Sequence, residues 1–335
     1  MGLEIEALKN DIKSLLQKYS RGSEQQQELL NEFILSTLLY NWEDPEPDEI
    51  IPLKEGLDEI RKSITMFKKY KYDTKISIFG SARVAADNAL YRITSEFAQK
   101  AAYNNYKIIT GAGPGIMEAG NVGAGPENSF GLGLNLPFEN DSGVFADFPE
   151  HITVFKHFYS RKLTFYRESQ AIVVMPGGFG TMDEIFQGMA SIQTGKLHVR
   201  PFLLMDKPGG IFWNNFDIWL KENLLKNEYI DNDDMLIYRI FYNADDTLNY
   251  IKHFYHNFFS YFMLEDRLFF QLKIKLKDAQ LKELNDYARQ YLFSEFIFVR
   301  ERYYNNGALY VYSCQKLNLY QYINVIKLIE MINNF

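Results

Sequence analysis

The chain has one cysteine, Cys314, and five histidines among 335 residues. A single thiol excludes an intramolecular disulfide framework and is typical of a reducing cytosol. The histidines are scattered and show no zinc-ligand spacing, so we expect no metal and no cofactor. No apolar run approaches the roughly 20 residues of a membrane span. The first residues, MGLEIEALKNDIKSLL, are amphipathic and charged, unlike a signal peptide. We therefore expect a cytoplasmic protein with no membrane partner.

The chain also lacks an excess of positive charge, since its formal net charge is −7. Binding to a nucleic-acid backbone is driven by clustered Lys and Arg, so we expect no nucleic-acid partner. A small phosphorylated ligand is still compatible with this charge, because a few backbone N–H groups and one arginine suffice to bind it.

Changes in sequence pattern predict three regions. Residues 1–70 have helical periodicity that is interrupted by Pro45 and Pro47. Residues 71–250 contain short apolar runs, KISIFG, YKIITGAG, FGLGLNLP, AIVVMPGG, RPFLLMD and LIYRIFYNAD, most of them followed by a turn and a helical stretch. This alternation predicts an α/β fold, a Rossmann-like, mostly parallel sheet with helices on both faces. Residues 251–335 read as strand, helix, hairpin around Asn305-Asn306-Gly307, and helix, which predicts a small α+β unit for regulation or assembly.

Three of the predicted strands end in glycine-rich turns. Glycine lets the backbone turn sharply and approach a ligand, and in a parallel sheet ligands bind at the carboxyl ends of the strands. The turns supply the candidate binding residues Gly80, Ser81, Arg83, Gly113, Gly115, Met117, Glu118, Gly177, Gly178, Gly180 and Thr181. Neither GxGxxG nor GxxxxGK[ST] fits any of them. Three such turns in one sheet nevertheless favour a phosphate site over purely steric glycines.

Glu184 has two interpretations. Thr181-Met182-Asp183-Glu184 has the form T-x-x-E, which is typical of a capping box in which Glu184 reaches back to the Thr181 N–H. Alternatively, the loop from Gly177 to Thr181 binds a phosphate, and Glu184 projects toward the sugar one turn further on. Both roles cannot be fully served at once, because a Glu folded back on the cap occupies N–H groups that a phosphate needs.

Arg161 lies in a segment, PEHITVFKHFYSRKLTFYRES, that has a helical pattern with Val154, Phe158 and Phe165 on one face. Arg161 falls on that same apolar stripe. Its guanidinium either extends to solvent or is held inward by an anionic partner, for which Glu184 or a ligand phosphate is the natural candidate. The neighbouring Lys162 reads as a surface lysine by pattern alone.

These residues together resemble the LOG ("lonely guy") family, whose members were long labelled possible lysine decarboxylases. The family signature PGGxGTxxE is matched by Pro176 to Glu184, and its upstream Arg-Lys motif by Arg161-Lys162. Longer members also resemble the first two glycine-rich turns, Asn121, and Leu136-Pro137-Phe138-Glu139. The resemblance covers about half of the chain, residues 75–250, and leaves the two ends outside the pattern of the small members.

The resemblance implies hydrolysis of the N-glycosidic bond of nucleoside 5′-monophosphates, AMP or N6-modified AMP as in cytokinin biosynthesis, to a free base and ribose 5-phosphate. It implies catalytic roles for Arg161 and Glu184, a phosphate site at Gly177, Gly178, Gly180 and Thr181, a binding role for Lys162, and a homodimer or larger homo-oligomer. A broad purine/pyrimidine monophosphate nucleosidase and a non-catalytic nucleotide or cofactor carrier are the alternatives.

Overall fold

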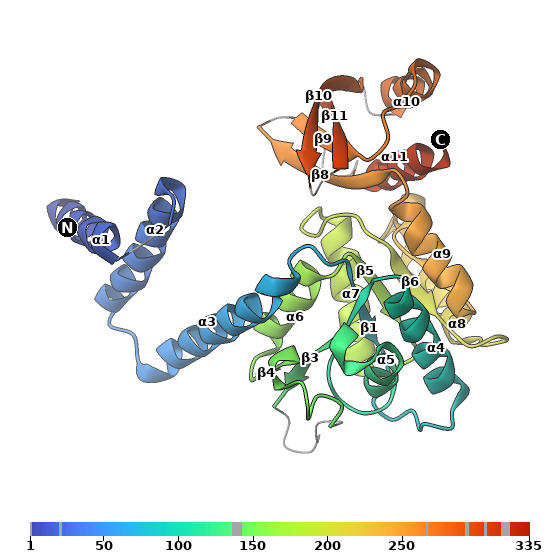
Figure 1. Ribbon diagram of the computed structural model, residues 1–335, viewed down its shortest axis with the longest axis horizontal. Coiled ribbons are helices and arrows are strands. Elements are labelled where there is room, and N and C mark those ends of the chain that lie inside the picture. Colours follow the sequence, from blue (N-terminus) through green and yellow to red (C-terminus); the bar gives the residue numbers. More distant parts are fainter. Residues whose placement is uncertain are drawn as a thin grey trace. The chain divides into compact units, whose positions relative to one another are not determined.

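The computed structural model describes residues 2–19, 22–135, 143–265, 267–291, 295–304, 307–315 and 322–335 (Figure 1). The chain divides into two compact units, Met1–Asp58 and Glu59–Phe335, and the boundary falls within helix α3. The three-part division at residues 70 and 250 that the sequence suggested stays a prediction.

The first unit is helical, as its periodicity predicted. It contains α1 (Gly2–Tyr19), α2 (Glu24–Tyr40) and the first part of α3 (Pro47–Phe67). Ser23 and Gln26 form a capping box that starts α2. Pro47 is the first residue of α3, a position where the missing N–H costs nothing, and Pro45 lies in the break before it, whereas α2 already ends at Tyr40.

The second unit is built on a seven-stranded sheet in the order β4-β3-β2-β1-β5-β6-β7, and every neighbouring pair in it is parallel. The strands are β1 (Lys75–Phe79), β2 (Lys107–Thr110), β3 (Ser129–Leu134), β4 (Ile152–Phe155), β5 (Ala171–Val174), β6 (Phe202–Met205) and β7 (Arg239–Phe241). The strand order reverses between β1 and β5, and this switch point is where a parallel sheet offers a crevice at its carboxyl edge.

Helices cover both faces of this sheet, because alternate residues of each strand point to opposite sides. Ile76, Ile78 and Val173 pack in one core with α4 (Ala89–Tyr103), α5 (Ile116–Ala124) and α9 (Ala244–Phe254). Phe79 and Val174 pack in the other with α6 (Phe158–Glu168), α7 (Phe179–Gln193) and α8 (Phe212–Leu220). The predicted α/β class, with helices on both faces, is thereby confirmed.

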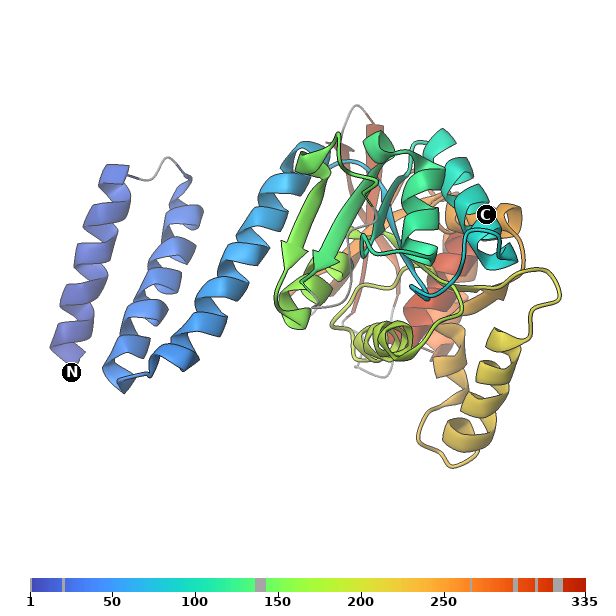
Figure 2. The same ribbon diagram turned by 90° about the horizontal axis from the view of Figure 1, so that it is seen from below.

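One strand of this sheet was not predicted. Residues Ile152–Phe155 read as the start of a helix, but they form the edge strand β4 beside β3 (green in Figure 2). The run Ile-Thr-Val is β-branched, which favours a strand and opposes a helix. The proposed apolar stripe was therefore wrong. Val154 and Phe158 are exposed, and only Phe165 of that set is buried.

The C-terminal part contains a second, antiparallel sheet in the order β10-β11-β9-β8. Its strands are β8 (Phe258–Leu264), β9 (Arg267–Leu272), β10 (Ile297–Tyr304) and β11 (Gly307–Gln315), and its helices are α10 (Asp278–Tyr291) and α11 (Tyr322–Asn334). The predicted α+β character is confirmed, with β8 as an additional strand. Asn305 and Asn306 of the predicted hairpin turn lie outside the described residues. Cys314 is buried here, and burial raises the pKa of its thiol to about 12, which makes it unreactive.

Candidate functional site

The three glycine-rich turns meet at the carboxyl edge of the parallel sheet. The Ser81 N–H, after β1, donates to the Pro176 carbonyl, after β5, over 3.2 Å. The Ser81 carbonyl accepts from the N–H of Ile116, the first residue of α5, over 3.1 Å. The backbone of Ser81, in the first turn, is thus hydrogen-bonded to both of the other turns. The sequence could only suggest that the three turns are neighbours.

Two glycines are required by this close approach. A Cβ on Gly115 would lie 2.5 Å from the Ser81 carbonyl oxygen, and Gly115 has a φ of +68°, a conformation that side chains rarely adopt. A Cβ on Gly80 would lie 2.5 Å from the Ile116 side chain. The first two turns therefore use glycine to pack against each other.

The third turn uses glycine differently. A Cβ on Gly178 or on Gly180 would meet no atom within 4 Å, so these glycines face open space. Gly178 is the N-cap of α7, no side chain caps this helix, and the side chain of Phe179 is 96% exposed. The first N–H groups of a helix have no partner inside it and carry a partial positive charge. This turn therefore has the properties of an anion-binding site.

The capping-box interpretation of Glu184 is wrong, because α7 begins earlier than that pattern requires. Its first residue is Phe179, which makes Thr181 the third residue of the helix and Glu184 the sixth. At about 1.5 Å per residue, Glu184 lies about 7 Å along the axis from the first residue. Its carboxylate is thus not needed to cap the helix.

Glu184 is buried, with 6% of its surface exposed. The Tyr166 hydroxyl on α6 donates to the Glu184 carbonyl over 2.7 Å and lies 3.3 Å from its Oε2. Burial raises the pKa of Glu184, while the positive charges of Lys162 and Arg161 and the Tyr166 hydroxyl act in the opposite direction. The pKa of Tyr166 is also raised, chiefly by burial. Tyr166 therefore stays protonated, and its hydroxyl acts as a hydrogen-bond donor.

Arg161 is held over the sheet rather than extended into solvent. Its Nε donates to the Leu132 carbonyl on β3 over 2.7 Å, and one of its terminal nitrogens donates to the Gly111 carbonyl over 3.4 Å. Its guanidinium also lies 5.3 Å from the Phe165 ring centre. A Cβ on Gly111 would lie 2.3 Å from that terminal nitrogen, so this glycine makes room for it.

Lys162 pairs with Asp183, the neighbour of Glu184, over 2.5 Å, and its side chain is 16% exposed. The pair links α6 to the start of α7. One further residue, Glu59, positions the start of α6. The buried carboxylate of Glu59 accepts from the Lys156 N–H over 2.6 Å and from the Ser160 hydroxyl over 2.5 Å.

The remaining predicted residues lie around the first two turns. The Arg83 N–H donates to the Ser81 hydroxyl over 3.1 Å, and the Arg83 side chain is exposed. Gly113 is buried in the second turn, and Met117 and Glu118 are half-buried in the first turn of α5. Leu136 to Glu139 lie outside the described residues. Sequence reasoning missed Tyr166 and Glu59, since neither belongs to a motif.

Two further properties concern the described ranges alone. No cluster of three or more His, Cys, Asp or Glu side chains there has the geometry of a metal site. None of the helices in these ranges has both the length and the apolar character needed to cross a membrane.

Comparison with known proteins gives a family match over part of this domain. A family model described as "Possible lysine decarboxylase" matches residues 98–251. These residues are similar to that family, and they include the Arg161-Lys162 and Pro176 to Glu184 motifs that resemble the LOG family. A search of curated proteins found no match.

Solved structures with a similar fold include three proteins of low sequence identity. The molybdenum cofactor binding protein of Rippkaea orientalis is 14% identical with a TM-score of 0.39, covering 54% of this chain and 96% of that one. The molybdenum cofactor carrier protein of Chlamydomonas reinhardtii is 15% identical with a TM-score of 0.36, covering 54% and 96%. DNA processing protein A of Helicobacter pylori is 15% identical with a TM-score of 0.38, covering 53% and 80%.

Proposed function

We propose that the protein hydrolyses the N-glycosidic bond of nucleoside 5′-monophosphates, AMP or N6-modified AMP, to a free base and ribose 5-phosphate. The observation that carries the proposal is a buried carboxylate, Glu184, about 7 Å along a helix whose glycine-rich start is uncapped and open. This spacing suits a ligand with a phosphate at one end and a reacting sugar beside it.

The phosphate would be bound by the N–H groups at the start of α7, within the turn from Gly177 to Thr181. Binding energy from this remote group orients the ribose without taking part in the reaction. Cleavage of the bond between C1′ and the base nitrogen builds positive charge on the ribose. The Glu184 carboxylate stabilises that charge or activates the attacking water.

Arg161 and Lys162 would support this role in different ways. Both positive charges favour the ionised form of Glu184 against the effect of burial. The contacts of Arg161 with the Leu132 and Gly111 carbonyls also hold its guanidinium near the carboxyl edge of β2 and β3, where a ligand would lie. Lys162, being paired with Asp183, acts on Glu184 through its charge.

The test is release of ribose 5-phosphate from AMP, other 5′-monophosphates and isopentenyl-AMP, with the matching nucleosides as controls. We expect release from monophosphates, with kcat/KM for the nucleosides at least 100-fold lower, because they lack the phosphate. Equal cleavage of nucleosides would contradict the phosphate site. Activity on many bases would favour the broad nucleosidase, and binding with no release would favour the carrier.

We expect Tyr166→Phe to move the acid limb of the pH profile to higher pH. Glu184 acts as a carboxylate, so activity is lost as the pH falls through its pKa. The variant removes a hydrogen bond that lowers this pKa, and the loss therefore begins at higher pH. The measurement is kcat/KM against pH, with the exposed Tyr103→Phe as the matched control. An unmoved acid limb in Tyr166→Phe would show that the hydroxyl has no effect on the reacting carboxylate.

The homo-oligomer and the cytoplasmic location remain proposals. Helices α1 to α3 leave several large hydrophobic side chains exposed, including Leu29, Phe33, Ile51 and Leu57. Exposed apolar surface of this kind is typical of subunit contacts.

A further inference from the structure

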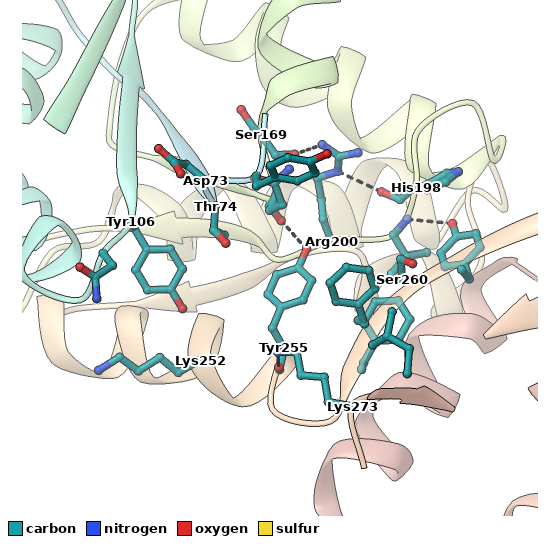
Figure 3. A pocket seen from close by; sticks show the side chains of 18 of the residues that line it. Asp73, Thr74, Tyr106, Ser169, His198, Arg200, Lys252, Tyr255, Ser260 and Lys273 are labelled. Atoms are coloured by element: carbon teal, nitrogen blue, oxygen red, sulfur yellow. Dashed lines mark hydrogen bonds between the residues drawn. The ribbon is translucent and has the colours of Figure 1, made fainter. Parts of the chain in front are cut away.

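A cavity of about 1020 Å³ lies at the opposite edge of the parallel sheet (Figure 3). Thr74, Tyr106, Gln170 and Arg200 line it, and these residues come just before β1, β2, β5 and β6 respectively. Because the strands are parallel, residues that precede them lie at the amino edge, whereas the glycine-rich turns follow them at the carboxyl edge. Residues of β8, β11 and the segment after β9 complete the wall, so the C-terminal sheet helps to form the cavity. The cavity is therefore separate from the candidate active site.

Positive charge gathers around this cavity although the chain as a whole is acidic. Lys71, Arg200, Lys252 and Lys273 line it, and within the described residues none of the four has a carboxylate partner. Arg167 also lines the cavity but pairs with Glu168. Asp73 is the one acidic side chain in the described lining. The cavity thus has an excess of cations that a bound anion would neutralise.

Arg200 is the most constrained of these cations. It donates to three backbone carbonyls, those of His198, Tyr166 and Ser169. Burial lowers its pKa, and the only groups that act against this effect are tyrosines. A half-buried guanidinium without a carboxylate is unfavourable, and an anionic ligand would stabilise it.

Aromatic rings form the other part of the lining. Tyr106, Tyr255, Phe258 and Tyr261 contribute to the wall, and Figure 3 shows Tyr106 and Tyr255 near Lys252 and Lys273. Tyr255 and Phe258 are stacked with their ring centres 6.2 Å apart. Aromatic faces beside cations are the chemistry that recognises a planar base attached to phosphates.

We propose that this cavity is a second ligand site, which binds a nucleotide carrying more than one phosphate. Lys71, Lys252, Lys273 and Arg200 would neutralise the phosphates, and the half-buried rings of Tyr106 and Tyr255 would contact the base. A cavity of this size holds such a molecule, since ligand pockets are commonly about 300–1,000 Å³.

The site has a short connection to the candidate catalytic carboxylate. Arg200 donates to the Tyr166 carbonyl over 2.8 Å, and the hydroxyl of the same Tyr166 contacts Glu184. A ligand that draws Arg200 toward its phosphates would change the position of Tyr166 and with it the carboxylate. The inference that occupancy of the cavity alters turnover rests on the proposed function, whereas the binding site itself does not.

The binding test uses ATP as the probe, with adenosine and tripolyphosphate as its two parts, in calorimetric titrations of the full chain. We expect ATP to bind more tightly than either part. Lys252→Ala/Lys273→Ala should weaken ATP binding at least tenfold, since both lysines are exposed and can be replaced without unfolding the protein. Lys196→Ala/Lys282→Ala, which removes two exposed lysines outside the cavity, should bind ATP as the wild type does.

Gly178→Asp, which blocks the phosphate turn of the candidate active site, distinguishes the two sites. ATP binding retained in Gly178→Asp and lost in the double lysine variant supports the second site. The reverse pattern, or no ATP binding by the wild type, overturns it. For the coupling, ATP should change ribose 5-phosphate release at least threefold in the wild type and leave the double lysine variant unaffected. Equal responses of both proteins would overturn the coupling.

Discussion

Gly178→Asp is expected to stabilise the fold while it abolishes productive binding of the substrate's phosphate. Gly178 is the N-cap of α7, its φ of −90° suits any residue, and a Cβ there meets no atom within 4 Å. Asp is a preferred N-cap residue, and its negative charge is favourable at a helix N-terminus, by about 0.3–1 kcal/mol. The same carboxylate would occupy the N–H groups that the phosphate needs and would repel it.

We expect KM for AMP to rise about 100-fold or more, because the lost contacts orient the substrate. The melting temperature should stay the same or rise by about 1–3 °C. Gly178→Asn is the matched control, since it has the same shape and caps a helix equally well but carries no charge. Its effect on KM should be clearly smaller. An unchanged KM in Gly178→Asp would place the phosphate elsewhere and remove the main support for the proposed function.

The class of fold could be predicted because buried parallel strands leave a strong local signal, a short apolar run that ends in a turn. This signal failed at β4, where Ile152 to Phe155 precede a helix without a glycine between them. It also failed at β8, where the aromatic run from Phe258 to Leu264 has no regular alternation. In both segments, pairing with a neighbouring strand decides the structure, and this is a tertiary effect that a local pattern does not contain.

The candidate site could be predicted only as far as its motifs extend. Glycines mark the turns, but their different roles depend on what lies opposite. Gly115 faces the Ser81 carbonyl, whereas Gly178 faces open space. The capping-box pattern misled because Phe179 and Gly180 are helical, and glycine is a poor helix former. Tyr166 and Arg200 belong to no motif, and only the packing of α6 against α7 and β6 gives them a role.

Glu184→Gln is expected to lower kcat by at least about 1,000-fold while AMP binding stays measurable. The amide has the shape of the carboxylate and can still accept a hydrogen bond from Tyr166, but it cannot stabilise a positive ribose or activate water. The phosphate contacts proposed at the start of α7 would be untouched. Glu150→Gln, at an exposed position outside the site, is the matched control and should keep full activity.

Stability gives a second, independent measurement on the same variant. The folded-state pKa of Glu184 is raised by burial, so the folded protein holds this proton more tightly than the unfolded chain does. The wild type therefore loses stability as the pH rises from the pKa of Glu184 in the unfolded chain through its pKa in the folded protein. Glu184→Gln has no such loss, because its amide does not titrate. We expect the melting temperature of Glu184→Gln, measured relative to that of the wild type, to be higher at pH 8 than at pH 4. A variant that loses stability equally at both pH values but keeps its turnover would show that Glu184 is a structural residue.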